Sequence, residues 1–494
     1  MIWCPFTFTS LVLLWLPIGS HATQKTLVLT DSAFEWNLNT LPNPNATGHL
    51  IFNTVSSLLQ HWPNTRYHNG HTIVPGTIPI GTLLYHGRTD PDVPLTREWA
   101  STDPEFARLF CFEFGQCWIL TLVTTRPLRV LYFDGSSATK MPDGPMDTQD
   151  IFAWGAVMPE RATVDWDYRR LHRMCDLGDT LGIDAFVRMQ LNFEIMLCNF
   201  TDGVQTVSLS RLQFEPRFPH HAYSYILSST WHDHFPGEPR IQLDLTHAIS
   251  LYDTALAPSL VSRRYGQDRR AHRVLGIDQR DVEAVAARVR AIPFSSRVSR
   301  IDWRTLFQVI RDRYAERLDA LHSTLHDASD DSAPRAFRLL QMLLAPYLVH
   351  SAVPPPADTN TAWAAPVFRL CATAHTSFAE SMNHTFTASE HMLLSATKET
   401  IREICRSLVG MWAIGVLELR DSKTISDVVG DQWRVDIDSL LGWLDWDSWI
   451  ACRPACAFDE SCYLPGAPFS MGEWNVSKPR CVRLFEPYSD IGIS

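Results

Sequence analysis

Residues 83–107 read LLYHGRTDPDVPLTREWASTDPEFA, and the character of the chain changes twice within this stretch. It begins as a short apolar run typical of a strand, which ends at the polar pair His86 and Gly87. A proline-containing loop follows, and residues 101–105 (STDPE) then have the pattern of a capped helix start. A strand followed so closely by a helix predicts a fold that mixes both elements.

Further strand patterns surround this stretch. The runs CWILTLVT (117–124) and LRVLYFDG (128–135) are rich in β-branched and aromatic residues, and a short link containing a proline separates them. We expect them to form a hairpin or adjacent strands. Residues 184–190 and 193–200 have the same character, whereas residues 165–177 are typical of a helix. This part of the chain predicts a mixed domain with mostly antiparallel strands.

The pattern becomes helical near residue 277. Amphipathic helices are expected over 278–292 and 302–325, with Asp278 and Asp302 as N-caps. The segment VPPPADT that follows them should be a stiff, extended linker. Beyond it, Thr387 is followed by a glutamate at the capping-box spacing ahead of a long helix.

The expected fold class is α+β, with a Cys/Trp-rich C-terminal cap. The expected divisions are a signal peptide over 1–22, a loose N-terminal arm over 23–50, a mixed α+β domain over 51–275, a helical region over 276–352, a Pro-rich linker over 353–360, and a helical, disulfide-stapled C-terminal region over 361–494.

The N-terminal apolar run FTFTSLVLLWLPIG is too short to span a bilayer comfortably. Small residues at Ser20 and Ala22 occupy the positions that a signal peptidase reads, so we expect cleavage after Ala22 and secretion to the extracellular space. A buried N-terminal strand or a signal anchor is the alternative. No later segment reaches the roughly 18 apolar residues of a membrane helix, so no transmembrane segment is expected after signal removal.

Cysteines and glycosylation sequons agree with an oxidising compartment. Once Cys4 leaves with the signal peptide an even number of cysteines remains, and these should mostly form disulfides. The expected disulfide cysteines are Cys111, Cys117, Cys175, Cys198, Cys371, Cys405, Cys452, Cys456, Cys462 and Cys481. The expected N-glycosylation acceptors are Asn45, Asn199, Asn383 and Asn475.

The C-terminal region combines tryptophans with the last four cysteines. Trp443, Trp446 and Trp449 are spaced three apart, which places them on one helical face. We expect them to pack against the disulfides that follow, and a sugar-stacking platform is the alternative. A Cys₄ zinc site is the alternative to those disulfides.

Composition excludes some classes of function. The net charge of −11 gives no basic field that would attract nucleic acid, and 20% charged residues with 45% hydrophobic residues are typical of a globular chain. The sequence contains no nucleophile elbow, Walker loop, HExxH helix or dinucleotide fingerprint.

Four short motifs each have more than one interpretation. The pair His232 and His234 suits a metal or a polar surface. The basic run SRRYGQDRRAHR (262–273) suits a phosphate-bearing ligand, a solvated loop or a processing site. The segment FDGSSA from residue 133 suits a ligand loop or a plain turn. The aspartates of residues 143–150 suit a cation or a solvated loop.

The run LLYHGR resembles the first catalytic strand of ADP-ribosyltransferase-like domains of the His-type class, where a strand ends in aromatic-His-Gly. ASTDPEFA would resemble the second element, and Glu194 lies where the family's last catalytic strand carries its glutamate. The resemblance covers about residues 80–200 and implies NAD as the substrate. It implies catalytic roles for His86 and Glu194.

In that family the His hydrogen-bonds a ribose of NAD, and the glutamate stabilises the oxocarbenium character of the other ribose. The resemblance implies NAD-binding roles for Tyr85, Gly87, Ser101 and Phe106, with Gly87 admitting the nicotinamide amide and Phe106 stacking on the ring. A non-catalytic secreted glycoprotein or binding protein of unknown role, with its aromatic C-terminus as the binding surface, is the alternative function.

A second resemblance covers more of the chain. LYFDGSSATKMPDGPMDTQDIFAWG and the Trp/Cys-rich C-terminus are similar to an uncharacterised family of secreted fungal proteins. This resemblance implies localisation and architecture, and it implies no activity. The acceptor or ligand, the disulfide connectivity and the oligomeric state stay open from the sequence.

Overall fold

The computed structural model describes residues 36–111, 116–213, 237–293, 301–356, 359–380, 382, 385–466 and 478–483. The expected signal peptide and the first part of the expected arm, residues 23–35, lie outside these residues. In the part of the arm that is described, Leu38 is buried and helix α1 (Gly48–Ser56) has already begun, so this part is packed rather than loose. Helix α2 (His61–Arg66) follows.

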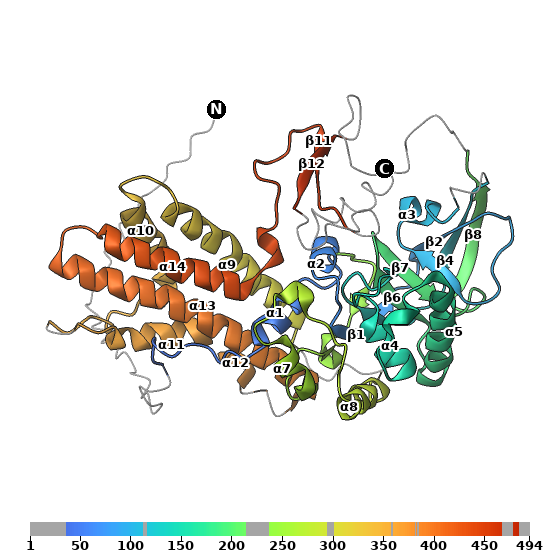
Figure 1. Ribbon diagram of the computed structural model, residues 1–494, viewed down its shortest axis with the longest axis horizontal. Helices are drawn as coiled ribbons and strands as arrows, with labels where there is room; N and C mark the ends of the chain where they lie inside the picture. The colour runs from blue at the N-terminus through green and yellow to red at the C-terminus, as the bar shows by residue number, and fades with distance from the viewer. Residues whose placement is uncertain are drawn as a thin grey trace, which may run out of the picture.

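A ten-stranded sheet forms the right half of Figure 1, with strand order β10-β1-β5-β6-β7-β3-β2-β4-β8 and β9 paired with β1. Its neighbouring strands are antiparallel except β5 and β6. The strands are β1 (Thr72–Ile78), β2 (Leu83–Arg88), β3 (Glu98–Ser101), β4 (Trp118–Thr124), β5 (Leu128–Phe133), β6 (Ala185–Met189), β7 (Phe193–Leu197), β8 (Val204–Arg211), β9 (Gln242–Leu243) and β10 (Ile249–Ser250). A mostly antiparallel α+β fold is confirmed.

The predicted pairing of residues 117–124 with 128–135 is wrong. Strand β4 pairs with β2 and β8, whereas β5 pairs with β1 and β6. Five strand steps separate β4 from β5 in the sheet order, which is about 24 Å in a flat sheet, but the three-residue link spans at most about 14 Å. The sheet therefore curls and brings the end of β4 back towards the start of β5.

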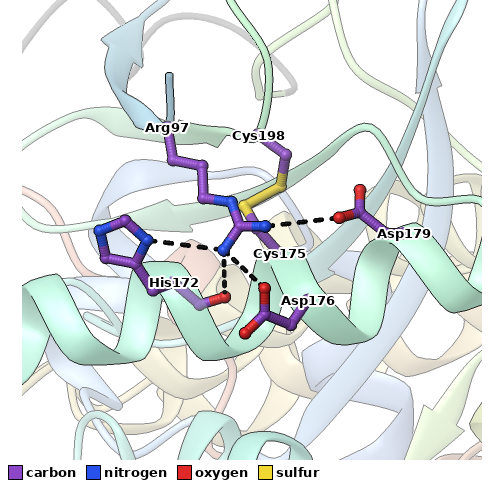
Figure 2. Close-up of a disulfide and its surroundings, with 6 residues drawn as sticks. All are labelled: Arg97, His172, Cys175, Asp176, Asp179 and Cys198. Atoms are coloured by element: carbon purple, nitrogen blue, oxygen red, sulfur yellow. Dashed lines mark hydrogen bonds and ion pairs between the residues drawn. A yellow bond between two sulfur atoms is a disulfide. The ribbon is translucent and has the colours of Figure 1, made fainter.

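Helices α4 (Asp147–Trp154), α5 (Val164–Leu181) and α8 (Gln279–Arg290) pack on one face of the sheet, which we call the α5 face. The disulfide Cys175–Cys198 ties α5 to the end of β7. Figure 2 shows Arg97 across the same helix, where it contacts Asp176 at 2.7 Å and Asp179 at 3.4 Å. These bonds fix α5 against the strands.

A helical bundle forms the left half of Figure 1. Its helices are α9 (Trp303–Leu325), α10 (Ser332–Leu344), α11 (Ala365–Thr373), α12 (Ser377–Glu380), α13 (Ala388–Asp421) and α14 (Asp427–Leu444). One continuous apolar core joins these helices and α1 to the second face of the sheet, which we call the bundle face. The Pro-rich linker, expected to divide two regions, connects α10 to α11 inside this one bundle.

The caps of the helices follow the sequence in part. The Thr387 hydroxyl accepts from the Glu390 amide, and the Glu390 carboxylate accepts from the Thr387 amide, so the capping box is confirmed. Asp302 caps α9 by accepting from the Thr305 amide. Asp278 precedes α8 without a capping bond from its side chain.

Five disulfides use all ten expected cysteines. The pairs are Cys111–Cys117, Cys175–Cys198, Cys371–Cys405, Cys452–Cys462 and Cys456–Cys481. The last two hold the hairpin of β11 (Glu460–Tyr463) and β12 (Arg480–Arg483), in which Cys462 lies opposite Cys481. Because these sulfurs are bonded to one another, the zinc alternative for the C-terminal cysteines is wrong.

In the described parts of the chain, none of the helices is long and apolar enough to cross a membrane.

The three tryptophans do not share a helical face as expected. Helix α14 ends at Leu444 because Asp445 adopts a left-handed conformation with φ of 43°. Trp446 and Trp449 therefore lie beyond the helix and stack on each other. Trp446 also stacks on Phe52 of α1, so this ring packs in the core against α1 rather than against the disulfides as expected.

Candidate functional site

The strand register separates the predicted catalytic pair. Ser101 lies opposite both Tyr85 and Glu194, so these three side chains project from the same face of the sheet. His86 follows Tyr85 and points to the bundle face, where its ring meets Phe200 edge-on. The catalytic roles that the resemblance implies for His86 and Glu194 require both side chains to reach one cleft. The register contradicts this, because the two side chains lie on opposite faces and two strands apart.

Glu194 belongs to a buried ionic cluster on the α5 face. Its Oε1 accepts from Arg188 at 2.9 Å and 2.5 Å, and Arg188 also donates to both oxygens of Asp167. Arg170 joins Asp167 to Asp150. Burial opposes ionisation of Asp167, but Arg188, Lys140 and Arg170 together hold its pKa well below its usual range. The cluster links β6 and β7 to α4 and α5 and has a structural role.

The other residues of the predicted NAD site also make structural contacts. A Cβ at Gly87 would lie 1.9 Å from the Ala107 carbonyl, so glycine here admits α3 (Pro104–Arg108) against the strand. The Ser101 hydroxyl donates to the Asp103 carbonyl, and Phe106 is buried against Phe110. Asp103 caps α3 as the sequence predicts.

Tyr85 packs half-buried beside the Cys111–Cys117 disulfide. Burial lowers the pKa of His86 to about 4, and its Nδ1 donates to the Trp99 carbonyl. The His86 ring is therefore neutral at pH 7 and is held by the backbone of the next strand.

Two further motifs of the sequence have structural roles. Asp134 accepts from the amides of His71 and Thr72 and closes the turn after β5, so the turn interpretation of FDGSSA holds. Asp147 pairs with Arg273, and Asp150 pairs with Arg170. Both aspartates are buried, so neither the cation nor the solvated-loop interpretation fits them.

The pair His232 and His234 lies outside the described residues, as do the sequons Asn383 and Asn475.

The basic run of residues 262–273 forms one wall of a cavity of about 510 Å³. The loop before α1 and the first turn of that helix form a second wall, and the end of α14 forms a third. In Figure 1 the cavity therefore lies near the centre of the molecule, where α1 and α7 (Val261–Arg264) lie between the bundle and the sheet. This volume is in the range of small-molecule binding sites.

Arg264 and Arg269 line this cavity, and in the described parts of the chain neither is within ion-pair distance of a carboxylate. Arg264 is only 7% exposed, donates through Nη1 to the Leu251 carbonyl, and lies 4.6 Å over the Tyr252 ring. Its Nε and Nη2 have no acceptor among the described residues, and the Nε of Arg269 has none either. Burial lowers the pKa of Arg264 to about 10, so the group keeps its charge at pH 7.

Two imidazoles complete the lining. Burial, followed by the charge of Arg269, lowers the pKa of His49 to about 3, and burial with Arg264 lowers the pKa of His272 to about 4. Both rings are neutral at pH 7 and offer polar atoms, His49 Nδ1 and His272 Nε2, that find no partner among the described residues. The His49 ring stacks on Trp443 with centroids 4.1 Å apart.

The remaining charges of the lining are paired. Asp445 contacts Arg66 at 2.9 Å, and Asp268 contacts Arg270 at 2.9 Å. In the described parts of the chain, the lining charges without an ion-pair partner are therefore positive and belong to Arg264 and Arg269, while the buried Asp447 outside the lining interacts electrostatically with Arg269. Guanidinium N–H groups without an acceptor, beside neutral imidazoles and aromatic faces, suit an organic anion with phosphate or carboxylate groups.

The sequence signals this cavity only in part. The basic run is visible, and the phosphate-ligand interpretation was one of three. The partner walls at His49 and Trp443 are distant in sequence from the basic run, and no local pattern links either residue to it, so pattern alone could not have joined them. A buried arginine is also indistinguishable from a solvated one in a loop sequence.

The sequence matches the family model described as the YPL277C N-terminal domain over residues 29–117 and 113–220. It is similar to the uncharacterized protein YOR389W of Saccharomyces cerevisiae, with 22% identity over 529 residues, 85% of this chain and 82% of that protein. It is similar to the uncharacterized protein YPL277C of the same yeast, with 28% identity over 206 residues, 32% of this chain and 42% of that protein. No solved structure matches the chain.

These similarities agree with the expected resemblance to an uncharacterised fungal family. Both yeast proteins are described only as uncharacterized, and neither description mentions ADP-ribosyl transfer. The chain is a disulfide-bonded protein similar to them.

Proposed function

We propose that this protein is a secreted, N-glycosylated binding protein whose central cavity takes a small organic anion with phosphate or carboxylate groups. The observation that carries the proposal is the buried guanidinium of Arg264, which has no carboxylate partner and two nitrogens without acceptors in the described parts of the chain. A buried unpaired charge costs several kcal/mol, so its retention is best explained by a ligand that pairs with it.

The surroundings of Arg264 support an anion rather than a cation or an apolar ligand. Arg269 adds a second guanidinium with no carboxylate within ion-pair distance in the described parts of the chain, while the acidic groups of the lining are bonded to other arginines. The rings of Tyr252 and Trp443 give the organic part of a ligand flat apolar surface. The ADP-ribosyltransferase hypothesis lacks such support, because its catalytic residues face away from each other.

Secretion is supported by three independent features. The chain begins with a signal-like apolar run, its disulfides need an oxidising compartment, and Asn45 and Asn199 are exposed. The Asn199 Oδ1 accepts from the amide and the hydroxyl of Thr201, so the sequon is ordered at the surface. Expression of the full chain should yield protein in the medium whose mass falls after enzymatic removal of N-glycans. Retention in the cell with an uncleaved N-terminus would contradict secretion.

Anion binding is tested by thermal unfolding with ribose 5-phosphate, citrate and the neutral control ribose. At least one of the two anions should raise the melting temperature in a saturable way, and ribose should not. The Arg264→Gln variant should lose the shift. Arg263→Gln is the matched control, because Arg263 is the exposed neighbour in the same short helix and does not line the cavity. Equal shifts in both variants would overturn the assignment.

A further inference from the structure

A second cluster of chemically reactive side chains lies on the bundle, and none of its residues lines the cavity. His322 is in the last turn of α9, and His326 is the residue that caps the C-terminus of the same helix. They are four residues apart and therefore lie on the same side of the helix. Asp438 of the neighbouring helix α14 reaches both of them. Two helices thus bring three potential metal ligands to one point.

The three ligand atoms converge closely. The Nε2 atom of His322 lies 3.2 Å from Oδ1 of Asp438, and the Nε2 atom of His326 lies 2.9 Å from the same oxygen. The ligand atoms all lie within 4.8 Å of one another. Zinc bound tetrahedrally at about 2.0–2.1 Å holds its ligand atoms about 3.3 Å apart, so the two His–Asp distances are already close to this spacing, and side-chain rotation alone would admit the ion.

The surroundings leave this cluster available. Asp438 has no other partner in the described parts of the chain, and all three side chains are accessible to solvent. Arg434, one turn before Asp438, donates to the Leu325 carbonyl and pairs with Asp431. Its charge is therefore engaged elsewhere and does not neutralise Asp438.

We propose that His322, His326 and Asp438 form a binding site for a divalent first-row transition-metal ion, with Zn²⁺ as the probe. Two imidazoles and one carboxylate are ligands that such ions share, and the exposed side leaves a coordination position for water or a further ligand. The bound ion joins the end of α9 to α14 and so stabilises the bundle. This site is independent of the anion cavity, and either can fail without the other.

The test is titration of the metal-free, full-length protein with zinc chloride by isothermal calorimetry. The wild type should bind one Zn²⁺ at this site, and His322→Ala, His326→Ala and Asp438→Asn should each weaken that binding at least tenfold. His350→Ala is the matched control, because His350 is exposed and is not part of the cluster. The residues changed are at the surface, and equal melting temperatures in chelator will confirm folding.

A second readout is the melting temperature with and without Zn²⁺. The ion should raise it in the wild type and in His350→Ala, and it should not in the three site variants. Zinc binding of unchanged affinity in all three variants, or no zinc binding by the wild type, would overturn the proposal.

Discussion

Oε1 of Glu194 lies 2.5 Å from Nη2 of Arg188, and both side chains are almost fully buried on the α5 face of the sheet. The same guanidinium also contacts Asp167 of α5 at 2.7 Å. One arginine therefore connects two adjacent strands to the helix that covers them. The glutamate that resembles a catalytic residue in the sequence is in this structure a part of the core.

Glu194→Gln should therefore lower stability without affecting ligand binding. Loss of one partner from a buried ion pair costs about 3–5 kcal/mol, and because Arg188 keeps Asp167 we expect a cost of about 2 kcal/mol. Urea unfolding measures it, with the exposed Glu316→Gln of α9 as the control. NAD hydrolysis by the wild type that is lost in Glu194→Gln at unchanged stability would contradict the structural role.

Two glycines with opposite surroundings should respond in opposite ways to alanine. Gly87→Ala places a Cβ 1.9 Å from a backbone carbonyl of α3, which cannot be relieved by a side-chain movement, so we expect a loss of about 2 kcal/mol or more. Gly410→Ala, within α13 and with nothing within 4 Å, should gain about 0.5–1 kcal/mol from helix propensity. Chemical denaturation compares the two. A Gly87→Ala variant as stable as the wild type would contradict the close contact of α3 with β2.

Each disulfide should contribute to the free energy of unfolding according to the length of chain that it closes. Cys371–Cys405 spans 34 residues and Cys111–Cys117 spans 6, so loop-closure entropy predicts about 4 and about 2 kcal/mol respectively. Paired alanine replacements of each bridge, unfolded in urea, measure the difference. A larger loss for the short bridge would show that contacts outweigh chain entropy here.

Asp447→Asn should change how stability depends on pH. Burial, opposed by Arg269 and Arg66, raises the pKa of Asp447 from 3.8 to about 6, and neither carboxylate oxygen has a hydrogen-bond partner among the described residues. Between these values the unfolded chain binds fewer protons than the folded one. The free energy of unfolding therefore falls as pH rises from about 4 to above 6, by about 3 kcal/mol from this group.

The asparagine variant should match the wild type near pH 4 and exceed its stability by up to about 3 kcal/mol at pH 7.5. Asp330→Asn, at an exposed position, is the control variant. Arg311 and Asp445 also act on this carboxyl, and both variants retain them. A constant difference between Asp447→Asn and the wild type across pH would contradict the raised pKa.

Local patterns predicted the elements better than their arrangement. The Thr387–Glu390 box and the Asp103 cap depend on residues three apart, and both are present. The neighbours of β4 depend on the curl of the whole sheet, which no local pattern contains. The same difference explains why the predicted catalytic pair was wrong. Which face each side chain occupies depends on its position in the strand register, and strand β3 lies between the strands of His86 and Glu194.

The cavity shows that burial, like strand arrangement, could not be predicted from the local sequence. Arg263 and Arg264 are adjacent in the sequence and chemically identical, yet one is exposed and the other is buried. Helix α7 places them on different sides, and only the packing of residues 252–272 against α1 reveals which one can meet a ligand. The metal cluster was missed because Asp438 is far in sequence from the two histidines.

In the function that we propose, Arg264 pairs with an anionic ligand in the cavity. Isothermal calorimetry with ribose 5-phosphate and with citrate tests it most directly, on the wild type, Arg264→Gln, Arg269→Gln and Arg263→Gln. We expect saturable binding of at least one anion by the wild type and the Arg263 variant. Binding by the Arg264 and Arg269 variants should be at least tenfold weaker. Absence of binding by the wild type, or equal affinity in all four proteins, would contradict it.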